Sequence, residues 1–196
     1  MRLALAFRRP RFYAQALYEG VGAMSLKKIG VASIGVMICM NGALLLWSTG
    51  SAGAATKGDR EALADARDYL STQPFSLQGL IAQVKFDGFS TVEATYGASH
   101  SGANWNKEGL LGAKQYLSTQ AFSRSGLIKQ LEFDKYTVGQ ASYGVARCGA
   151  NWNTEAYKDA KQYLSTQPFS LRGLIGQLEF DGFTAAQASA GAHKAY

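Results

Sequence analysis

The chain has 196 residues and a formal net charge of +6, a value that raises the question of nucleic-acid binding. Most of this excess positive charge lies in the N-terminal part, because the residues from Ala55 onward contain 14 Lys and Arg and 13 Asp and Glu. Binding to phosphate groups requires clustered Lys and Arg, so the near-neutral remainder argues against nucleic acid as a partner.

An uncharged apolar run covers residues 29–47, directly after Lys27-Lys28, and small residues with an A-x-A pattern follow it. A positive start, an apolar middle and a small-residue end predict a signal peptide in residues 1–54. A spanning helix needs roughly 17–25 residues, so an uncleaved anchor that attaches the chain to the membrane is the alternative. In both cases the Lys and Arg residues before the apolar run stay on the cytoplasmic side of the membrane, and the part of the chain after the run is expected on the outer side. Met24 offers an alternative start to Met1.

The two cysteines, Cys39 and Cys148, carry different expectations. Cys39 lies within the apolar run and follows the bulky residues 36–38, whereas a lipidation cysteine follows small residues at the end of such a run. We therefore expect no lipid on Cys39. Cys148 would be the one thiol of the exported part, which excludes an intrachain disulfide after cleavage.

The remainder of the chain is organised by a segment that recurs every 47 residues. Tyr69-Leu-Ser-Thr-Gln-Pro-Phe-Ser76 returns, with one change, at residues 116–123 and again at 163–170. A fixed period of this length is the mark of a repeat architecture. We expect three tandem helical repeats, at residues 55–106, 107–153 and a shortened 154–196.

Each repeat is expected to open with an amphipathic helix. Asn106 and Asn153 are predicted as the N-caps of this helix in the second and third repeats. Trp105 and Trp152 precede them and are predicted to be hydrophobic staples on the first turns of the same helices. Asp59 takes the cap position in the first repeat. Small residues followed by a Tyr-Leu pair recur at helical spacing and indicate close helix packing.

An extended link and a second helix should follow. Pro74 and Pro168 stop the first helix and push the preceding residue toward extended geometry. Serine N-caps preceded by phenylalanine staples then recur in all three repeats, as Phe75 and Ser76, Phe122 and Ser123, and Phe169 and Ser170. Left-handed residues are predicted to end the second helices at Gly88, Lys135 and Gly182.

A third, shorter helix is predicted from a capping box that recurs as Ser90-x-x-Glu93, Thr137-x-x-Gln140 and Thr184-x-x-Gln187. It should end near Gly97, Gly144 and Gly191. No strand pattern is present in the sequence. The predicted fold is therefore all-α, with each repeat ordered as helix, extended link, helix and short helix, after an N-terminal signal or transmembrane segment.

The sequence contains no pattern typical of a catalytic or cofactor site. There is no phosphate-binding glycine loop, no metal-spaced set of Cys and His, and no nucleophile and base with sequence support. We expect no enzyme activity, no cofactor and no metal. The aspartate that follows each second helix, at Asp87, Asp134 and Asp181, is interpreted as a turn residue rather than a catalytic group.

The repeated pattern Ala-x-x-Tyr-Leu-x-x-x-x-Phe-Ser-x-x-Gly-Leu-Ile-x-Gln-Leu, then Phe-x-Gly-Phe-Thr-x-x-Gln-Ala, then Asn-Trp-Asn, resembles the Ltp family of host cell surface-exposed lipoproteins. The resemblance covers about residues 59–196. It implies compact helix-extended-loop-helix units on the outer face of the cytoplasmic membrane. A secreted chain is the alternative location. For the best-known members it implies superinfection exclusion, which blocks entry of another phage's DNA, with that phage's tape-measure protein as the partner.

Candidate partner-binding residues are a glutamine of each second helix and the hydroxyl residues after each first helix. They are Gln83, Gln130, Gln177, Ser71, Thr72, Ser118, Thr119, Ser165 and Thr166. A half-buried glutamine satisfied by backbone groups is the alternative for the first three. The leading hypothesis is an exported protein that binds another protein. The alternatives are a cell-envelope binding or adhesion module and, disfavoured by charge and export, a DNA-binding helix-extended-loop-helix protein.

Overall fold

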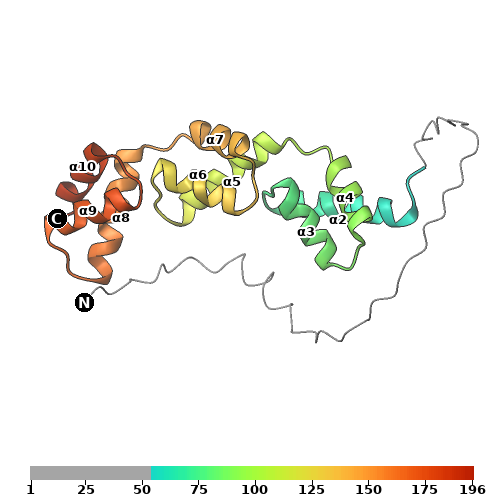
Figure 1. The fold of residues 1–196 in the computed structure, drawn as a ribbon, viewed down its shortest axis with the longest axis horizontal. Coiled ribbons are helices and arrows are strands. Elements are labelled where there is room, and N and C mark those ends of the chain that lie inside the picture. Colours follow the sequence, from blue (N-terminus) through green and yellow to red (C-terminus); the bar gives the residue numbers. More distant parts are fainter. Residues whose placement is uncertain (1–53) are drawn as a thin grey trace, which may run out of the picture. The chain divides into compact units, whose positions relative to one another are not determined.

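The computed structural model describes residues 54–196, which form nine α-helices in three groups of three (Figure 1). The first repeat contains α2 (Lys57–Thr72), α3 (Leu77–Phe86) and α4 (Thr91–His100). The second contains α5 (Trp105–Thr119), α6 (Arg124–Phe133) and α7 (Val138–Arg147). The third contains α8 (Trp152–Thr166), α9 (Leu171–Phe180) and α10 (Ala185–Ala195). The predicted all-α class and the order of helices in the repeats are confirmed.

The predicted signal or anchor segment, with its apolar run at 29–47, lies outside the described residues. Among residues 54–196, no helix combines the length and the apolar character needed to cross a membrane.

Each repeat has an apolar core of its own. In the first repeat, two alanines from α2, Leu80 and Val84 from α3 and two alanines from α4 are fully buried. The second and third repeats bury the equivalent residues, with Leu127 and Leu131 or Leu174 and Leu178 from the second helix. Full burial of one such aliphatic side chain contributes about 1.5–3 kcal/mol, so the second helix supplies much of the stability of each unit.

The first and third helices of each repeat lie in direct backbone contact. A Cβ added at Gly97 of α4 would lie 2.5 Å from the carbonyl oxygen of Ala62 in α2. Gly144 and Gly191 have the same position in the other repeats, and an added Cβ would meet the backbone of the first helix there too. The prediction that these glycines end the third helix is wrong, because the helices run past them to His100, Arg147 and Ala195.

The N-caps confirm one set of predictions and correct another. The serine caps of all three second helices and the capping boxes of all three third helices are present. The first helices, however, are capped by Asn104 and Asn151, whose side chains accept from backbone N–H groups of the first turn. Asn106 and Asn153 are therefore not caps. In the first repeat the cap is Thr56, in a capping box with Asp59.

Trp105 and Trp152 are the first residues of α5 and α8, so they do not precede a cap and do not form the predicted staples. Each is partly buried and packs against the core of the preceding repeat, Trp105 on the first and Trp152 on the second. In contrast, the phenylalanines before the serine caps, such as Phe75, do pack on cores that contain the leucine four positions into the second helix. The tryptophans therefore tie neighbouring repeats together.

Hydroxyl groups also connect neighbouring repeats, at contacts that we call repeat junctions. The Ser76 hydroxyl donates to the backbone carbonyl of Asp134 at 2.6 Å. One repeat later, the Ser123 hydroxyl donates to the carbonyl of Asp181 at 2.6 Å. In each case the N-terminal end of a second helix binds the turn that follows the second helix of the next repeat.

Each junction also buries a glutamate from the first helix of the next repeat. Glu108 is 8% exposed, and burial raises the pKa of its carboxyl group, although the nearby backbone of Phe75 and the charge of Lys107 oppose this shift. Glu155 is 5% exposed at the following junction. There the Ser125 hydroxyl adds a hydrogen bond to the carbonyl of Gly182 at 2.9 Å.

The predicted ends of the second helices are confirmed, since Gly88, Lys135 and Gly182 have φ values of 101°, 70° and 92°. Among the described residues, Lys135 is the one non-glycine with a positive φ. A side chain in this conformation costs free energy that glycine avoids.

We predict that Lys135→Gly raises the free energy of unfolding of the second repeat by about 0.5–1 kcal/mol, because it relieves this strain. Urea denaturation followed by circular dichroism measures the change. Lys129→Gly, at an exposed position inside α6, is the matched control and should lower stability by about 1 kcal/mol. Equal losses for both variants would contradict the prediction.

Candidate functional site

A hydrogen-bonded triad of one glutamine, one tyrosine and one aspartate recurs in every repeat. In the first, the Tyr69 hydroxyl donates to Asp87 at 2.9 Å and accepts from the Gln83 amide at 3.1 Å. Tyr116, Asp134 and Gln130 form the second triad, and Tyr163, Asp181 and Gln177 form the third. The triad joins the end of the first helix to the end of the second.

The triad changes the interpretation of two predicted positions. Gln83, Gln130 and Gln177 are half-buried, and the amide group of each is engaged with a tyrosine hydroxyl rather than with the backbone. The aspartates occupy the C-cap of the second helix, as the turn interpretation predicted, and each also binds the tyrosine. The amide group of each glutamine therefore holds the tyrosine hydroxyl of its own repeat in place.

The predicted hydroxyl residues lie exposed at the C-terminal end of each first helix. Ser71 donates to the carbonyl of Asp68 at 2.7 Å, and Thr72 donates to the carbonyl of Tyr69 at 2.9 Å. Ser118, Thr119, Ser165 and Thr166 repeat this pattern. Because the hydroxyl protons bond within the helix, these residues offer a partner their oxygen atoms as acceptors.

Sequence reasoning missed one repeated surface feature, which is the last residue of each second helix. Phe86, Phe133 and Phe180 are 63%, 50% and 75% exposed. The signal was available, because this phenylalanine lies six residues after the core leucine and so falls outside the helical stripe of buried positions. Exposed aromatic side chains are enriched in the contact surfaces of protein complexes.

The triad fixes the exposed phenylalanine relative to the hydroxyl residues. Phe86 directly precedes Asp87, and Asp87 holds the hydroxyl of Tyr69, which lies two residues before Ser71. Each repeat therefore presents one aromatic ring and two hydroxyl oxygens from helix ends that the triad holds together. We call these residues the presented end of the repeat.

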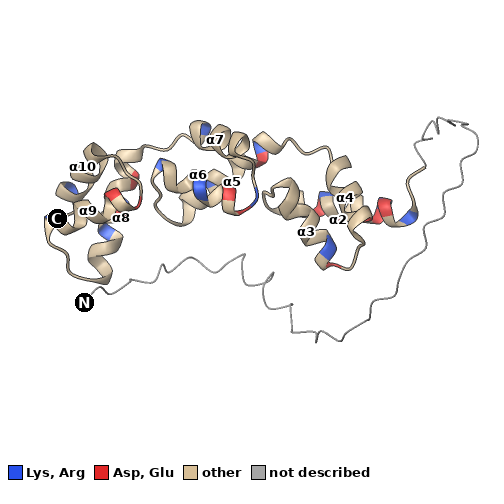
Figure 2. Ribbon diagram, viewed as in Figure 1, with Lys and Arg blue, Asp and Glu red and all other residues tan. Residues whose placement is uncertain are grey.

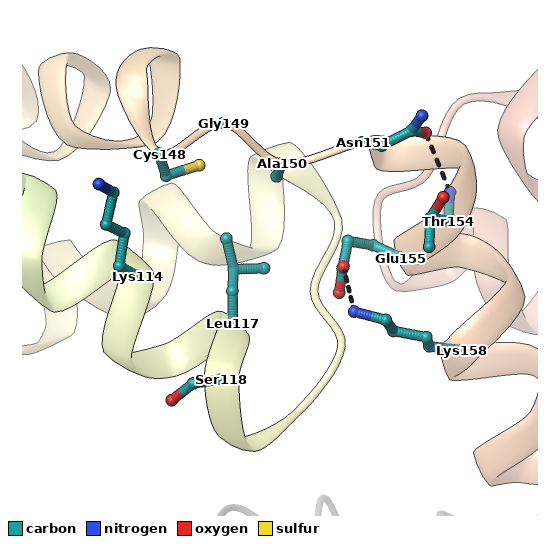
Figure 3. Close-up of a pocket in the computed structure, with 10 residues that line it drawn as sticks. All are labelled: Lys114, Leu117, Ser118, Cys148, Gly149, Ala150, Asn151, Thr154, Glu155 and Lys158. Carbon is teal, nitrogen blue, oxygen red and sulfur yellow. Dashed lines mark hydrogen bonds and ion pairs between the residues drawn. The ribbon is translucent and has the colours of Figure 1, made fainter.

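An open groove of about 300 Å³ lies beside the second repeat junction (Figure 3). Lys114 and Leu117 of α5, the segment from Cys148 to Asn151, and Glu155 and Lys158 of α8 line it. Glu155 forms an ion pair with Lys158 at 2.8 Å, while its other carboxylate oxygen is buried without a hydrogen-bond partner. No group of three potential metal-ligating side chains gathers anywhere in residues 54–196.

Charges of both signs are interspersed over the helices of residues 54–196 (Figure 2). One local exception is a group of three carboxyls in the third repeat, where burial and the charges of Asp181 and Glu155 raise the pKa of Asp159 to about 7. Burial and Asp87 raise the pKa of the equivalent Asp65 in the first repeat.

The second repeat replaces this carboxyl group by a different arrangement. Gly112 stands at the position of Asp65 and Asp159, and Tyr136 stands where the other repeats have phenylalanine. A Cβ at Gly112 would lie 3.3 Å from the Tyr136 hydroxyl, which donates to the carbonyl of Glu108 at 3.3 Å. The glycine thus makes room for the larger aromatic residue.

We predict that Asp159→Asn stabilises the third repeat at high pH. A pKa raised in the folded state stabilises the protein fully below the unfolded value of 3.8, and this stabilisation is lost as the pH rises through about 7. At pH 8 the free energy of unfolding of the variant should exceed that of the wild type by up to roughly 4 kcal/mol. The difference is smaller to the extent that solvent screens the half-buried Asp159 carboxylate. Hydrogen exchange of the α8 and α9 amides measures this difference. A gap between the two proteins that does not grow from pH 4 to pH 8 would contradict the prediction.

Comparison with known families identifies the repeats. A family model for Lipoprotein_Ltp, described as host cell surface-exposed lipoprotein, matches residues 58–100, 104–147 and 151–189. Neither a curated protein nor a solved structure matches the chain. The three matches confirm the resemblance drawn from the sequence. Cys39 lies outside the described residues, so the expectation that it carries no lipid stays a prediction.

Proposed function

The chain belongs to the Ltp family of host cell surface-exposed lipoproteins, and we propose that its three repeats lie outside the cytoplasmic membrane and bind another protein there. The observation that carries this proposal is the presented end, which recurs with an exposed phenylalanine in all three repeats. A large aromatic side chain that stays exposed in the folded chain gains favourable free energy when a partner buries its apolar surface. Three copies on one chain raise the effective concentration for a partner that offers several apolar sites.

The most specific form of the proposal is superinfection exclusion. The repeats would bind a protein of an incoming phage next to the membrane, the tape-measure protein being the candidate, and so keep its DNA out. The support is the family resemblance together with the near balance of charge in the repeat region. Without a strong field to steer a partner, recognition should depend on apolar contact rather than on ionic strength.

Export is the first requirement of this proposal. Protease added to intact cells, or to protoplasts where a wall shields the surface, should remove the repeats, whereas a cytoplasmic marker protein should survive. Repeats that stay protected until the cells are lysed would contradict the predicted location.

Phage challenge tests the function itself. Cells that express the chain should show reduced productive infection by at least one phage of a broad panel, with unchanged adsorption and with reduced DNA entry. Replacing Phe86, Phe133 and Phe180 together by serine should reduce the protection at least tenfold. Because these side chains are at least half exposed, each replacement should lower the free energy of unfolding by no more than about 1 kcal/mol.

The matched control replaces two other exposed apolar residues, Val92 and Val138, by serine. These lie at the start of the third helices and should leave the protection unchanged. If neither variant differs from the wild type, the presented end is not the binding surface. If no phage is affected by the wild type, a cell-envelope binding or adhesion role accounts better for the same residues.

A further inference from the structure

The two terminal repeats of the described chain each carry one open half of a repeat junction. The internal junctions bury the Ser76 and Ser123 hydroxyls, each 2% exposed, against the next repeat. The equivalent Ser170 in the third repeat is exposed. Similarly, an added Cβ at Gly126 would lie 3.3 Å from the carbonyl oxygen of Asp181, whereas at Gly173 it would meet only its own repeat.

The first repeat carries the opposite half. Glu108 and Glu155 are buried by the repeat before them, whereas the side chain of the equivalent Glu61 is 57% exposed and lies 3.6 Å from Lys57. An added Cβ at Gly88 would meet nothing within 4 Å, although the equivalent Gly182 contacts the serines of the preceding repeat.

The residues at these open halves match those of the internal junctions. Phe169-Ser-Leu-Arg-Gly173 differs from Phe75-Ser-Leu-Gln-Gly79 at one position, which is Arg172. Arg172 is exposed and stands at the position of Ser125, whose hydroxyl binds the carbonyl of Gly182 at the internal junction. The half that carries it therefore has a positive side chain, and the opposite half has the acidic residues Glu61 and Asp87.

We propose that the third repeat of one molecule binds the first repeat of a second copy through the contact that joins repeats within the chain. In this contact the Ser170 hydroxyl donates to the Asp87 carbonyl, as Ser76 and Ser123 do at the internal junctions, and Glu61 becomes buried as Glu108 and Glu155 are. The two halves lie on different repeats, so the association is head-to-tail, and further molecules can add to it to form a ring or an open chain.

The intermolecular contact should be weaker than the internal one. Gly58 occupies the place of Trp105 and Trp152, so the first repeat brings no tryptophan to the core of the preceding molecule. The contact also lacks the covalent connection that gives the internal junctions a high effective concentration. Association should therefore depend on protein concentration and become pronounced where copies gather on one membrane surface.

Disulfide trapping tests the geometry. At the internal junction, a Cβ at Gly182 would lie 3.5 Å from the Cβ of Ser125, within the range of a disulfide. The equivalent intermolecular pair is Gly88 and Arg172. Two full-length proteins are therefore compared, one with Gly88→Cys and one with Arg172→Cys, both in a background in which Cys39 and Cys148 are replaced by serine.

Mild oxidation of the mixture should give mainly the heterodimer, at least tenfold more than either homodimer. The double variant Ser125→Cys with Gly182→Cys serves as the intramolecular positive control. Heterodimer yield equal to that of the homodimers would overturn the proposal, because only head-to-tail docking brings the two different positions together.

A second measurement does not depend on the cysteine variants. In sedimentation velocity, the average mass of the wild-type protein should rise with concentration without stopping at the dimer. Arg172→Glu should weaken this association about tenfold, although glutamate near a helix N-terminus favours folding of α9. Lys129→Glu, which makes the same charge change away from the contact, should behave as the wild type. A wild-type protein that stays monomeric over the whole concentration range would overturn the proposal.

Discussion

The direct backbone contact between the first and third helices determines how such a short unit can fold. Gly97 and its equivalents remove the Cβ that would hold the two helices apart, and small residues such as Ala62 lie beneath them. The second helix then closes the core with two aliphatic side chains. A unit of 47 residues is close to the lower limit for independent stability, so the tryptophans and hydroxyls that tie neighbours together matter for the whole array.

Features determined by a few neighbouring residues could be predicted from the sequence. The serine caps, the capping boxes and the left-handed residues at the ends of the second helices all depend on bonds that span three or four positions. The resemblance to a family added the repeat architecture. Even Lys135, a poor residue for its conformation, was identified by its alignment with Gly88 and Gly182.

Features determined by distant residues could not be predicted in the same way. Both asparagines of Asn-Trp-Asn are suitable caps, and the burial of the tryptophan in the preceding repeat selects Asn104 and Asn151. Gly97 was expected to stop a helix because its contact with Ala62 is invisible in the local sequence. Likewise, the glutamines were identified as notable, but their tyrosine partners lie 14 residues away, and an exposed phenylalanine contradicts the usual expectation of burial.

The repeat junctions recognise a neighbour through its backbone carbonyl groups, as when Ser76 binds Asp134 and Ser123 binds Asp181. A carbonyl group is present whatever side chain follows it, and the turn indeed carries lysine in one repeat and glycine in another. The hydroxyl-to-carbonyl part of the junction therefore needs no compensating substitution when one unit succeeds another, whereas the tryptophan part depends on the side chain. Unequal crossing-over between the nearly identical segments would lengthen or shorten such a gene by whole units, and each product would retain these hydroxyl-to-carbonyl contacts.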